Sequence, residues 1–441
     1  MKNSNTNGAD GTGAPAGLPR SLQIFLGVAV TLLMVAGIVE TICRYYLHFG
    51  PPYNSPLLSE HFADLLTLRP RFQNLHTLLF FTDINDPPYM YPAPVAICYR
   101  VFFSFAPHEL GVFLSFVVLC FVVAAILFGR ELIRRNLSRT ATILLLGISL
   151  VTSFPLWMEL KQANMEICSW VLLAVGLWAF LRGRGYTSAA CFGIAGAMKI
   201  TPFFYLGLFL ARRQYRHILF ALLSAAVVTV PSLWMIYPHI GDSWRLTNLA
   251  VSKFRTVVTL HIYEHLAFDH SLFGVIKKVA FKHLSYHQLS HLLTIYSIIA
   301  ALCMLLVFFL WVRKLPVINQ VICLCVATLI LPPTSFDYTL LSLYLPWAML
   351  VLLAVHRGNR NQDVPGLVLA MVCFAILFVP ETEIILHRRS IAGQLKALTL
   401  VALFFIALRY PFHFSNSAEW LNDLKKKLRM NPRGVELTRA T

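Results

Sequence analysis

Residues 161–213 read KQANMEICSWVLLAVGLWAFLRGRGYTSAACFGIAGAMKITPFFYLGLFLARR. The stretch holds apolar runs at 165–181, 187–199 and 202–211, which are separated by an arginine pair and by a Lys-Ile-Thr-Pro break. The first run approaches the roughly 20 residues that cross a bilayer, whereas the other two are shorter. We interpret the shorter two as one kinked helix or a shallow hairpin. The pattern indicates closely spaced apolar helices.

The rest of the 441-residue chain repeats this pattern. Hydrophobic residues make up 57% of the chain, charged residues only 13%, and the mean hydropathy is +0.66. A soluble domain usually carries about 25% charged residues. Apolar runs recur from residue 22 to residue 408 with short polar breaks. We therefore predict an all-α polytopic membrane protein with about twelve transmembrane helices, in which two short runs do not cross alone.

The two ends of the chain differ from this apolar unit. Residues 1–20 are rich in Gly, Ala, Asn and Thr, which predicts disorder. The run Leu22–Cys43 is long enough to span a bilayer and reads as an uncleaved anchor rather than a signal peptide. We divide the chain into a disordered cytoplasmic N-terminus (1–20), a transmembrane unit (21–410) with external loops near 44–108 and 238–290, and a basic cytoplasmic tail (411–441).

The basic residues predict an orientation. If the N-terminus is cytoplasmic and the helices alternate, short internal turns hold most of the arginines, as the positive-inside rule requires. This needs residues 91–106 to be external or re-entrant, and residues 56–81 read as a helix lying in the interface plane. Nearly all of the net charge of +17 then faces anionic inner-leaflet lipid, so we do not expect nucleic acid as a partner. The internal turns hold Arg130, Arg134, Arg135, Arg139, Arg182, Arg184, Arg212, Arg213, Arg216, Arg313, Lys314, Arg357 and Arg360.

Polar residues gather on the predicted external side. Ionisable groups at membrane depth are costly and usually functional. A cleft of mixed charge there suits a substrate with a lipid tail and an anionic head, in which Lys or Arg holds a phosphate and a carboxylate takes a proton. Each residue also has a structural interpretation, such as helix capping for Gln162 and Asn164 or snorkelling for Lys199. The histidines of 261–291 lack clear ligand spacing, and we expect no metal and no cofactor.

Several short motifs, taken in order, resemble glycosyltransferase family 87. Lys161-Gln162-Ala163-Asn164, an Arg-Gly-Arg turn, Met198 to Pro202 and Arg212-Arg213 are similar to the family's Gly-Gln-x-Asn, Lys-x-x-Pro and arginine-rich elements. Tyr89 to Pro94 resembles its Tyr-x-Tyr-Pro-Pro element, and Asp269 to Gly274 its Asn-Gln-Ser-Leu-x-Gly element. Pro333 to Pro346 is similar to its His-Tyr segment. The chain differs at Lys161, at His270 where Gln is usual, and at Asp337 where His is usual.

The resemblance implies a C-type glycosyltransferase fold and an inverting transfer from a polyprenyl-phosphate sugar, mannose favoured over a pentose, to a lipid or glycan acceptor. Asp64 is the aspartate of the first external loop that fits the general base, and Lys199 and Arg255 are positioned to stabilise the leaving phosphate. The site would lie on the periplasmic or extracellular face of the cell membrane. The further candidate donor-phosphate or substrate residues are Gln162, Asn164, Tyr89, Tyr91, His270, Asp337 and Tyr338.

Two other classes of function compete with this one. A secondary transporter, or a flippase of a lipid-linked or small anionic substrate, should show two similar halves with paired helix breaks. We find one break, at Lys199 to Pro202, and no partner break in the other half. A non-catalytic membrane scaffold would leave the external polar residues unexplained.

Overall fold

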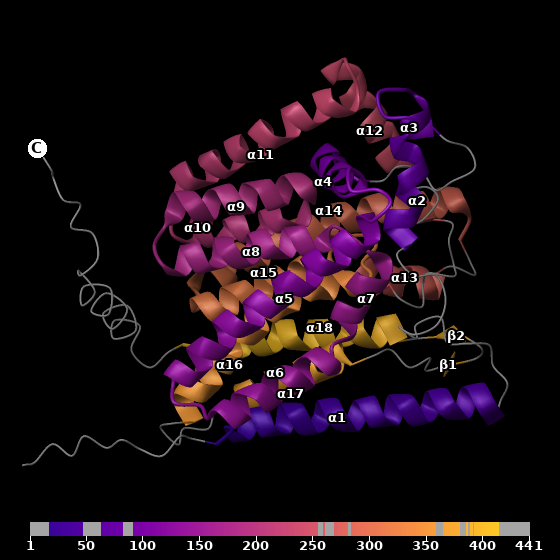
Figure 1. The fold of residues 1–441 in the computed structure, drawn as a ribbon. Helices are drawn as coiled ribbons and strands as arrows, with labels where there is room; N and C mark the ends of the chain where they lie inside the picture. The colour runs from indigo at the N-terminus through magenta and orange to yellow at the C-terminus, as the bar shows by residue number, and fades with distance from the viewer. Residues whose placement is uncertain are drawn as a thin grey trace, which may run out of the picture.

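The computed structural model describes residues 17–46, 63–82, 91–254, 259–260, 269–280, 284–358, 365–379, 385–386, 389–390 and 392–413. These residues form a bundle of helices whose long members run side by side (Figure 1). The only strands in the described ranges are β1 (Ile385–Leu386) and β2 (Arg389–Ser390), which pair antiparallel. The predicted all-α membrane architecture is confirmed at this level. The C-type glycosyltransferase fold stays a prediction.

Six helical segments are long and apolar enough to cross a membrane, or seven if one bent pair counts as a single span, among the described residues. The predicted number of about twelve is therefore not established. The six are α1 (Arg20–Thr41), α5 (Glu109–Arg134), α11 (Tyr215–Ile236), α14 (Tyr286–Leu310) with a 3₁₀ turn Val312–Lys314, the 3₁₀ segment Asp337–Leu343 with α16 (Tyr344–Gly358), and α18 (Ala392–Arg409).

Shorter helices fill the bundle between these segments. The bent pair, α6 (Arg139–Val151) and α7 (Phe154–Gln162), turns by 50° where Ser153 caps α7 and Pro155 occupies its first turn. Prolines are favoured in a first turn, where the missing N–H is not needed. The other short apolar helices are α8 (Glu166–Leu181), α9 (Gly185–Met198), the 3₁₀ segment Thr201–Leu206 with α10 (Gly207–Ala211), α15 (Val317–Ile330) and α17 (Pro365–Phe378).

The predicted break after residue 198 is confirmed. Helix α9 ends at Met198, and Lys199 takes extended backbone angles before the 3₁₀ segment that contains Pro202. Small residues of α9 allow close packing on α11: a Cβ added to Gly193 would lie 2.1 Å from the carbonyl oxygen of Ala221. Such small-residue contacts are typical of helices packed within a membrane.

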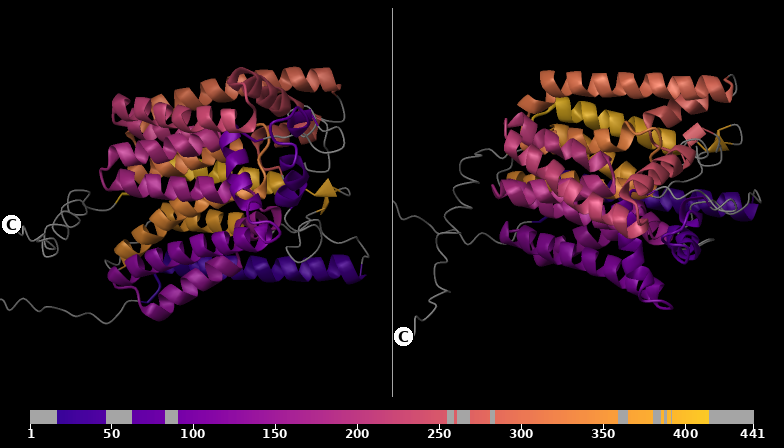
Figure 2. Two further views of the ribbon diagram at one scale, coloured as in Figure 1. Left: turned by 45° about the horizontal axis from the view of Figure 1, so that its top comes forward. Right: turned by 90° about the horizontal axis from the view of Figure 1, so that it is seen from above.

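The two ends of the bundle are different. The start of α1 lies near the end of α16, since a Cβ on Gly358 would lie 2.8 Å from Pro19. At the same end, Asn319 of α15 donates to the carbonyl of Tyr410, just after α18. The opposite end carries short helices and both strands (Figures 1 and 2). The short helices there are α2 (Ala63–Phe72), α3 (Leu79–Thr82), α4 (Ala93–Phe103), α12 (Ile240–Phe254) and α13 (Leu272–Ala280).

The two predicted non-spanning stretches lie at this second end. Helices α2 and α3 occupy the described part of 56–81, and α4 is an 11-residue helix within 91–106. An 11-residue helix is about half the length needed to cross a bilayer. The first and last described residues therefore both lie at the end of the bundle opposite the short helices. This agrees with the prediction that the two termini share one side of the membrane. Which side of the membrane each end of the bundle faces stays a prediction.

Candidate functional site

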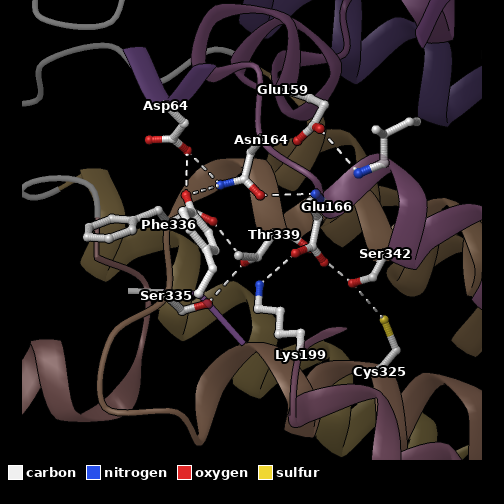
Figure 3. A network of polar contacts seen from close by, with 12 residues as sticks. Asp64, Glu159, Asn164, Glu166, Lys199, Cys325, Ser335, Phe336, Thr339 and Ser342 are labelled. Carbon is white, nitrogen blue, oxygen red and sulfur yellow. Dashed lines mark hydrogen bonds and ion pairs between the residues drawn. The ribbon is translucent and has the colours of Figure 1, made fainter. Parts of the chain in front are cut away.

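A hydrogen-bonded aspartate lies where α2, the start of α4 and the α7–α8 turn meet. The Tyr91 hydroxyl donates to Asp64 Oδ2 at 2.9 Å, and Asn164 Nδ2 donates to the same oxygen at 2.7 Å. Asn164 Nδ2 also lies 3.0 Å from the Tyr91 hydroxyl. We call these three residues the aspartate cluster. Within the described residues Asp64 Oδ1 accepts no hydrogen bond, and Figure 3 shows it pointing away from the cluster.

The backbone of the α7–α8 turn places Asn164 in this cluster. Helix α7 ends at Gln162, and the next residue, Ala163, takes left-handed angles (φ 51°, ψ 48°) that cost a residue with a Cβ about 1–2 kcal/mol. The Tyr99 hydroxyl donates to the Ala163 carbonyl at 3.3 Å and helps to hold the turn. The side-chain carbonyl of Asn164 then accepts from the backbone N–H of Glu166 at 3.0 Å. Asn164 therefore bonds both the first backbone N–H of α8 and the carboxylate of Asp64.

The surroundings of Asp64 adjust its acidity in two opposing ways. Burial raises the pKa of the carboxyl above its usual value, and the hydrogen bonds from Asn164 and Tyr91 partly lower it. The pKa of Tyr91 lies well above its usual value because of burial and the neighbouring carboxylate, so Tyr91 stays a donor. A carboxylate with a raised pKa and a free oxygen is a competent proton acceptor near neutral pH.

A lysine–glutamate pair lies beside the aspartate cluster. Lys199 Nζ bonds Glu166 Oε2 at 2.6 Å and lies 5.7 Å from the ring centre of Tyr338. The side chain of Lys199 is 34% exposed, whereas that of Glu166 is 8% exposed. Lys199 reaches this position because the chain leaves helical geometry at that residue. A half-buried ammonium of this kind can form charge-assisted hydrogen bonds with an anionic ligand as well as with Glu166.

The Lys199–Glu166 pair forms part of the wall of a cavity that opens to solvent; its empty space, open solvent included, is about 410 Å³. Hydroxyl groups supply most of the remaining polar wall, and Leu173, Leu329 and two prolines supply the apolar part. Asn164 joins the cavity to the aspartate cluster, because it bonds Asp64 on one side and the Glu166 backbone on the other (Figure 3). The hydroxyl-bearing residues of the wall are Thr201, Tyr205, Thr328, Thr334, Ser335, Thr339 and Ser342.

A second polar group lies behind this cavity, and it is almost completely buried. His270 Nε2 lies 2.9 Å from Ser335 Oγ, and its Nδ1 lies 3.7 Å from Asp337 Oδ1. Lys396 Nζ bonds the same Asp337 oxygen at 2.9 Å, and Asp269 Oδ1 accepts from the Ser335 backbone N–H at 3.0 Å. We call these five residues the histidine cluster. Each of them is at most 5% exposed.

The acidity of this second cluster follows from its burial. Desolvation raises the pKa of Asp269 to about 6, although backbone N–H groups of Ser271 and Ser335 donate to it. The pKa of His270 lies well below its usual value because of burial and the charges of Lys396 and Lys199. His270 is therefore neutral at pH 7. Its Nε2 atom forms a hydrogen bond between two uncharged groups, the imidazole and the Ser335 hydroxyl.

The structure brings together five of the ten residues that the sequence singles out. Asp64, Tyr91 and Asn164 are bonded to one another, and Lys199 and Tyr338 lie beside them. His270 and Asp337 belong instead to the histidine cluster. Gln162, half-buried at the end of α7, makes no hydrogen bond with a described residue. Tyr89 and Arg255 lie outside the described residues.

Two charged residues of these clusters escape sequence reasoning. Glu166 lies at the edge of an apolar run, and its pairing with Lys199 joins positions 33 residues apart. Lys396 lies within the last apolar run, and its partner Asp337 is 59 residues away. A lone charge inside an apolar helix is itself a signal, because it is costly unless it is paired. Across the described ranges, no group of three His, Cys, Asp or Glu side chains is placed to hold a metal ion.

Comparisons with known proteins agree with the motifs. The model of one family, glycosyltransferase family 87, matches residues 89–332, which is more than half of the chain. The matched range includes Tyr91, Asn164, Glu166 and Lys199. It begins after Asp64 and ends before Asp337. No curated protein and no solved structure matches the chain.

Proposed function

The chain belongs to glycosyltransferase family 87 and is therefore a membrane glycosyltransferase, and we propose that it transfers a sugar from a polyprenyl-phosphate donor with Asp64 as the base. The sugar is a hexose or a pentose, with mannose favoured, and the acceptor is a lipid or glycan hydroxyl. One observation carries the proposal: an oxygen of the Asp64 carboxylate accepts no hydrogen bond from a described residue, and this carboxylate is linked through Asn164 to a cavity lined by the half-buried ammonium of Lys199.

The proposed step is a single displacement. The acceptor oxygen attacks the anomeric carbon and forms the new glycosidic bond, while the bond from that carbon to the phosphate oxygen breaks. The hydroxyl proton passes to Asp64 Oδ1, and the electron pair of the broken bond leaves with the polyprenyl phosphate. Attack from the side opposite the leaving group inverts the anomeric centre. A positioned base of this kind contributes about 10²- to 10⁴-fold to the rate.

The polar groups around Asp64 support separate roles. Tyr91 and Asn164 both donate to Oδ2, so they orient the carboxylate and leave Oδ1 toward the acceptor. Lys199 supplies the positive charge that stabilises the departing phosphate, at the expense of its bond to Glu166. A pre-formed ion pair keeps the ammonium in place until an anion arrives.

The proposed site lies at the end of the bundle that carries the short helices, away from the end of α18 (Figure 1). The positive-inside rule, applied to the arginine-rich turns, favours the periplasmic or extracellular face for this end. A polyprenyl-phosphate donor fits this position, because its chain stays in the bilayer while its phosphate and sugar lie at the surface.

The test is a transfer assay with purified protein and a panel of polyprenyl-phosphate sugars. We expect the Asp64→Asn variant to lose at least about 10²-fold in transfer rate, because an amide takes no proton from the acceptor. Asp242→Asn is the matched control, since Asp242 is 49% exposed on α12 and pairs only with Arg245 among the described residues. Transfer by Asp64→Asn at the control's rate would remove Asp64 as the base.

A further inference from the structure

Some polar side chains of the cavity wall have donor or acceptor sites that no described residue occupies. A hydroxyl group has one donor and two acceptor sites. The Ser335 hydroxyl has two contacts, His270 Nε2 at 2.9 Å and Thr339 Oγ1 at 3.1 Å. One site of Ser335 is therefore left for a ligand. Glu166 is similar, because Oε2 bonds Lys199 while Oε1 accepts no hydrogen bond in the described part of the chain.

The polar part of the cavity wall is unsuited to a lipid chain, although apolar side chains supply the larger share of the lining. Burying a hydroxyl or a carboxylate against hydrocarbon without a partner costs roughly 1–3 kcal/mol or more. A carbohydrate supplies both donors and acceptors at the spacing of neighbouring hydroxyls.

We propose that this cavity binds the single sugar of the donor, and that Ser335 and Glu166 are the side chains that recognise its hydroxyls. His270 is a positioning residue, since it lies behind Ser335 and fixes the direction of that hydroxyl. The sugar then lies between Lys199, which holds the phosphate, and Asn164, which leads to Asp64. The inference rests on the proposed function and adds the residues that choose the sugar.

The test compares equilibrium binding of polyprenyl-phosphate mannose, polyprenyl-phosphate arabinose and sugar-free polyprenyl phosphate. The wild-type protein should bind at least one sugar-bearing lipid more tightly than the sugar-free lipid. Ser335→Ala should lower the affinity for that lipid by about 5- to 10-fold, the worth of one hydrogen bond, and leave sugar-free lipid unchanged. Lys199→Gln is the contrasting variant, because losing the ammonium should weaken both kinds of lipid.

Donor analogues that each lack one sugar hydroxyl sharpen this test. The analogue that lacks the hydroxyl bound by Ser335 should lose affinity with the wild type and lose nothing further with Ser335→Ala. Ser149→Ala controls for deletion of a buried hydroxyl, since Ser149 bonds only the Leu145 carbonyl, away from the cavity.

The outcomes separate this inference from the proposed function. Equal binding of sugar-bearing and sugar-free lipids by the wild type overturns the inference, as does an equal loss of both in Ser335→Ala. Sugar-dependent binding without transfer supports the inference and counts against the proposed transfer. Transfer that is lost in Asp64→Asn but unchanged in Ser335→Ala supports the proposed transfer and counts against the inferred role of Ser335.

Discussion

The aspartate cluster connects to the cavity through Asn164 and Glu166, whereas the histidine cluster reaches it through Ser335, and the two differ in exposure and in charge. In the aspartate cluster one carboxylate oxygen of Asp64 accepts no hydrogen bond from a described residue, and Lys199 beside it is 34% exposed. The histidine cluster pairs its carboxylate of Asp337 with Lys396, and none of its five residues is more than 5% exposed. Ser335 is the one member of the histidine cluster that lines the cavity, and the other four residues lie behind it. Substitutions in the aspartate cluster should change chemistry, whereas substitutions of the buried charges behind Ser335 should change stability.

The largest effect should come from Lys396→Met, which leaves the buried Asp337 without its cation. Breaking a buried pair in this way costs about 3–5 kcal/mol of unfolding free energy. Denaturant or thermal unfolding of the purified protein in detergent measures this loss. Adding Asp337→Leu should restore most of the stability, because a well-packed apolar pair avoids the uncompensated charge. A Lys396→Met protein as stable as the wild type would contradict the structural role of the Lys396–Asp337 pair.

Tyr91→Phe should have an intermediate effect that is confined to chemistry. The Tyr91 hydroxyl stabilises the carboxylate form of Asp64, and its hydrogen bond lowers the carboxyl pKa. Its removal therefore raises that pKa further, so the acid limb of the pH–rate profile moves to higher pH. We expect transfer at neutral pH to fall about 10-fold, the worth of one hydrogen bond to a charged group. A reduced rate without a shifted limb would assign Tyr91 to substrate contact instead.

The smallest effect should come from Gln162→Ala. Gln162 lies two residues from Asn164, but it bonds no described residue and ends α7 at the surface of the cluster. We expect less than about twofold change in transfer and less than about 0.5 kcal/mol in stability, as for other surface positions. Asn164→Ala is the matched comparison, since it removes a partner of Asp64. Equal losses for the two variants would show that Gln162 contacts substrate.

The sequence predicts the local features of this fold well. The break at Lys199 follows from a Thr-Pro pair in an apolar run, and the structure has it. The sequence analysis predicts no bend between α6 and α7, because residues 140–158 are largely apolar and hydropathy alone marks no break there. The Ser153 cap and Pro155 were the available signal, since both are typical of a helix start.

Pairings between distant segments are where sequence reasoning stops. Motif order singles out Asp64 and Asn164 separately, but nothing in the sequence joins two residues that lie 100 positions apart. The same applies to Asp337, which reads as a substrate residue in a polar turn. Its exposure of 0% and its bond to Lys396 depend on how α18 packs against the 3₁₀ segment. The charge of Lys396 is visible in the sequence, but its partner is not.

The spacing of these contacts has a consequence for biosynthesis. The cavity needs residues from Glu166 to Ser342, and the wall behind it needs Lys396 from the last helix. A chain emerging from its amino end can therefore pair Asp64 with Asn164 long before the cavity exists. Until Lys396 is in place, Asp337 lacks the cation with which it pairs in the folded protein. We expect insertion of α18 to be the step that commits the nascent protein to its folded form, and chains ending before residue 392 to be substrates for membrane quality control.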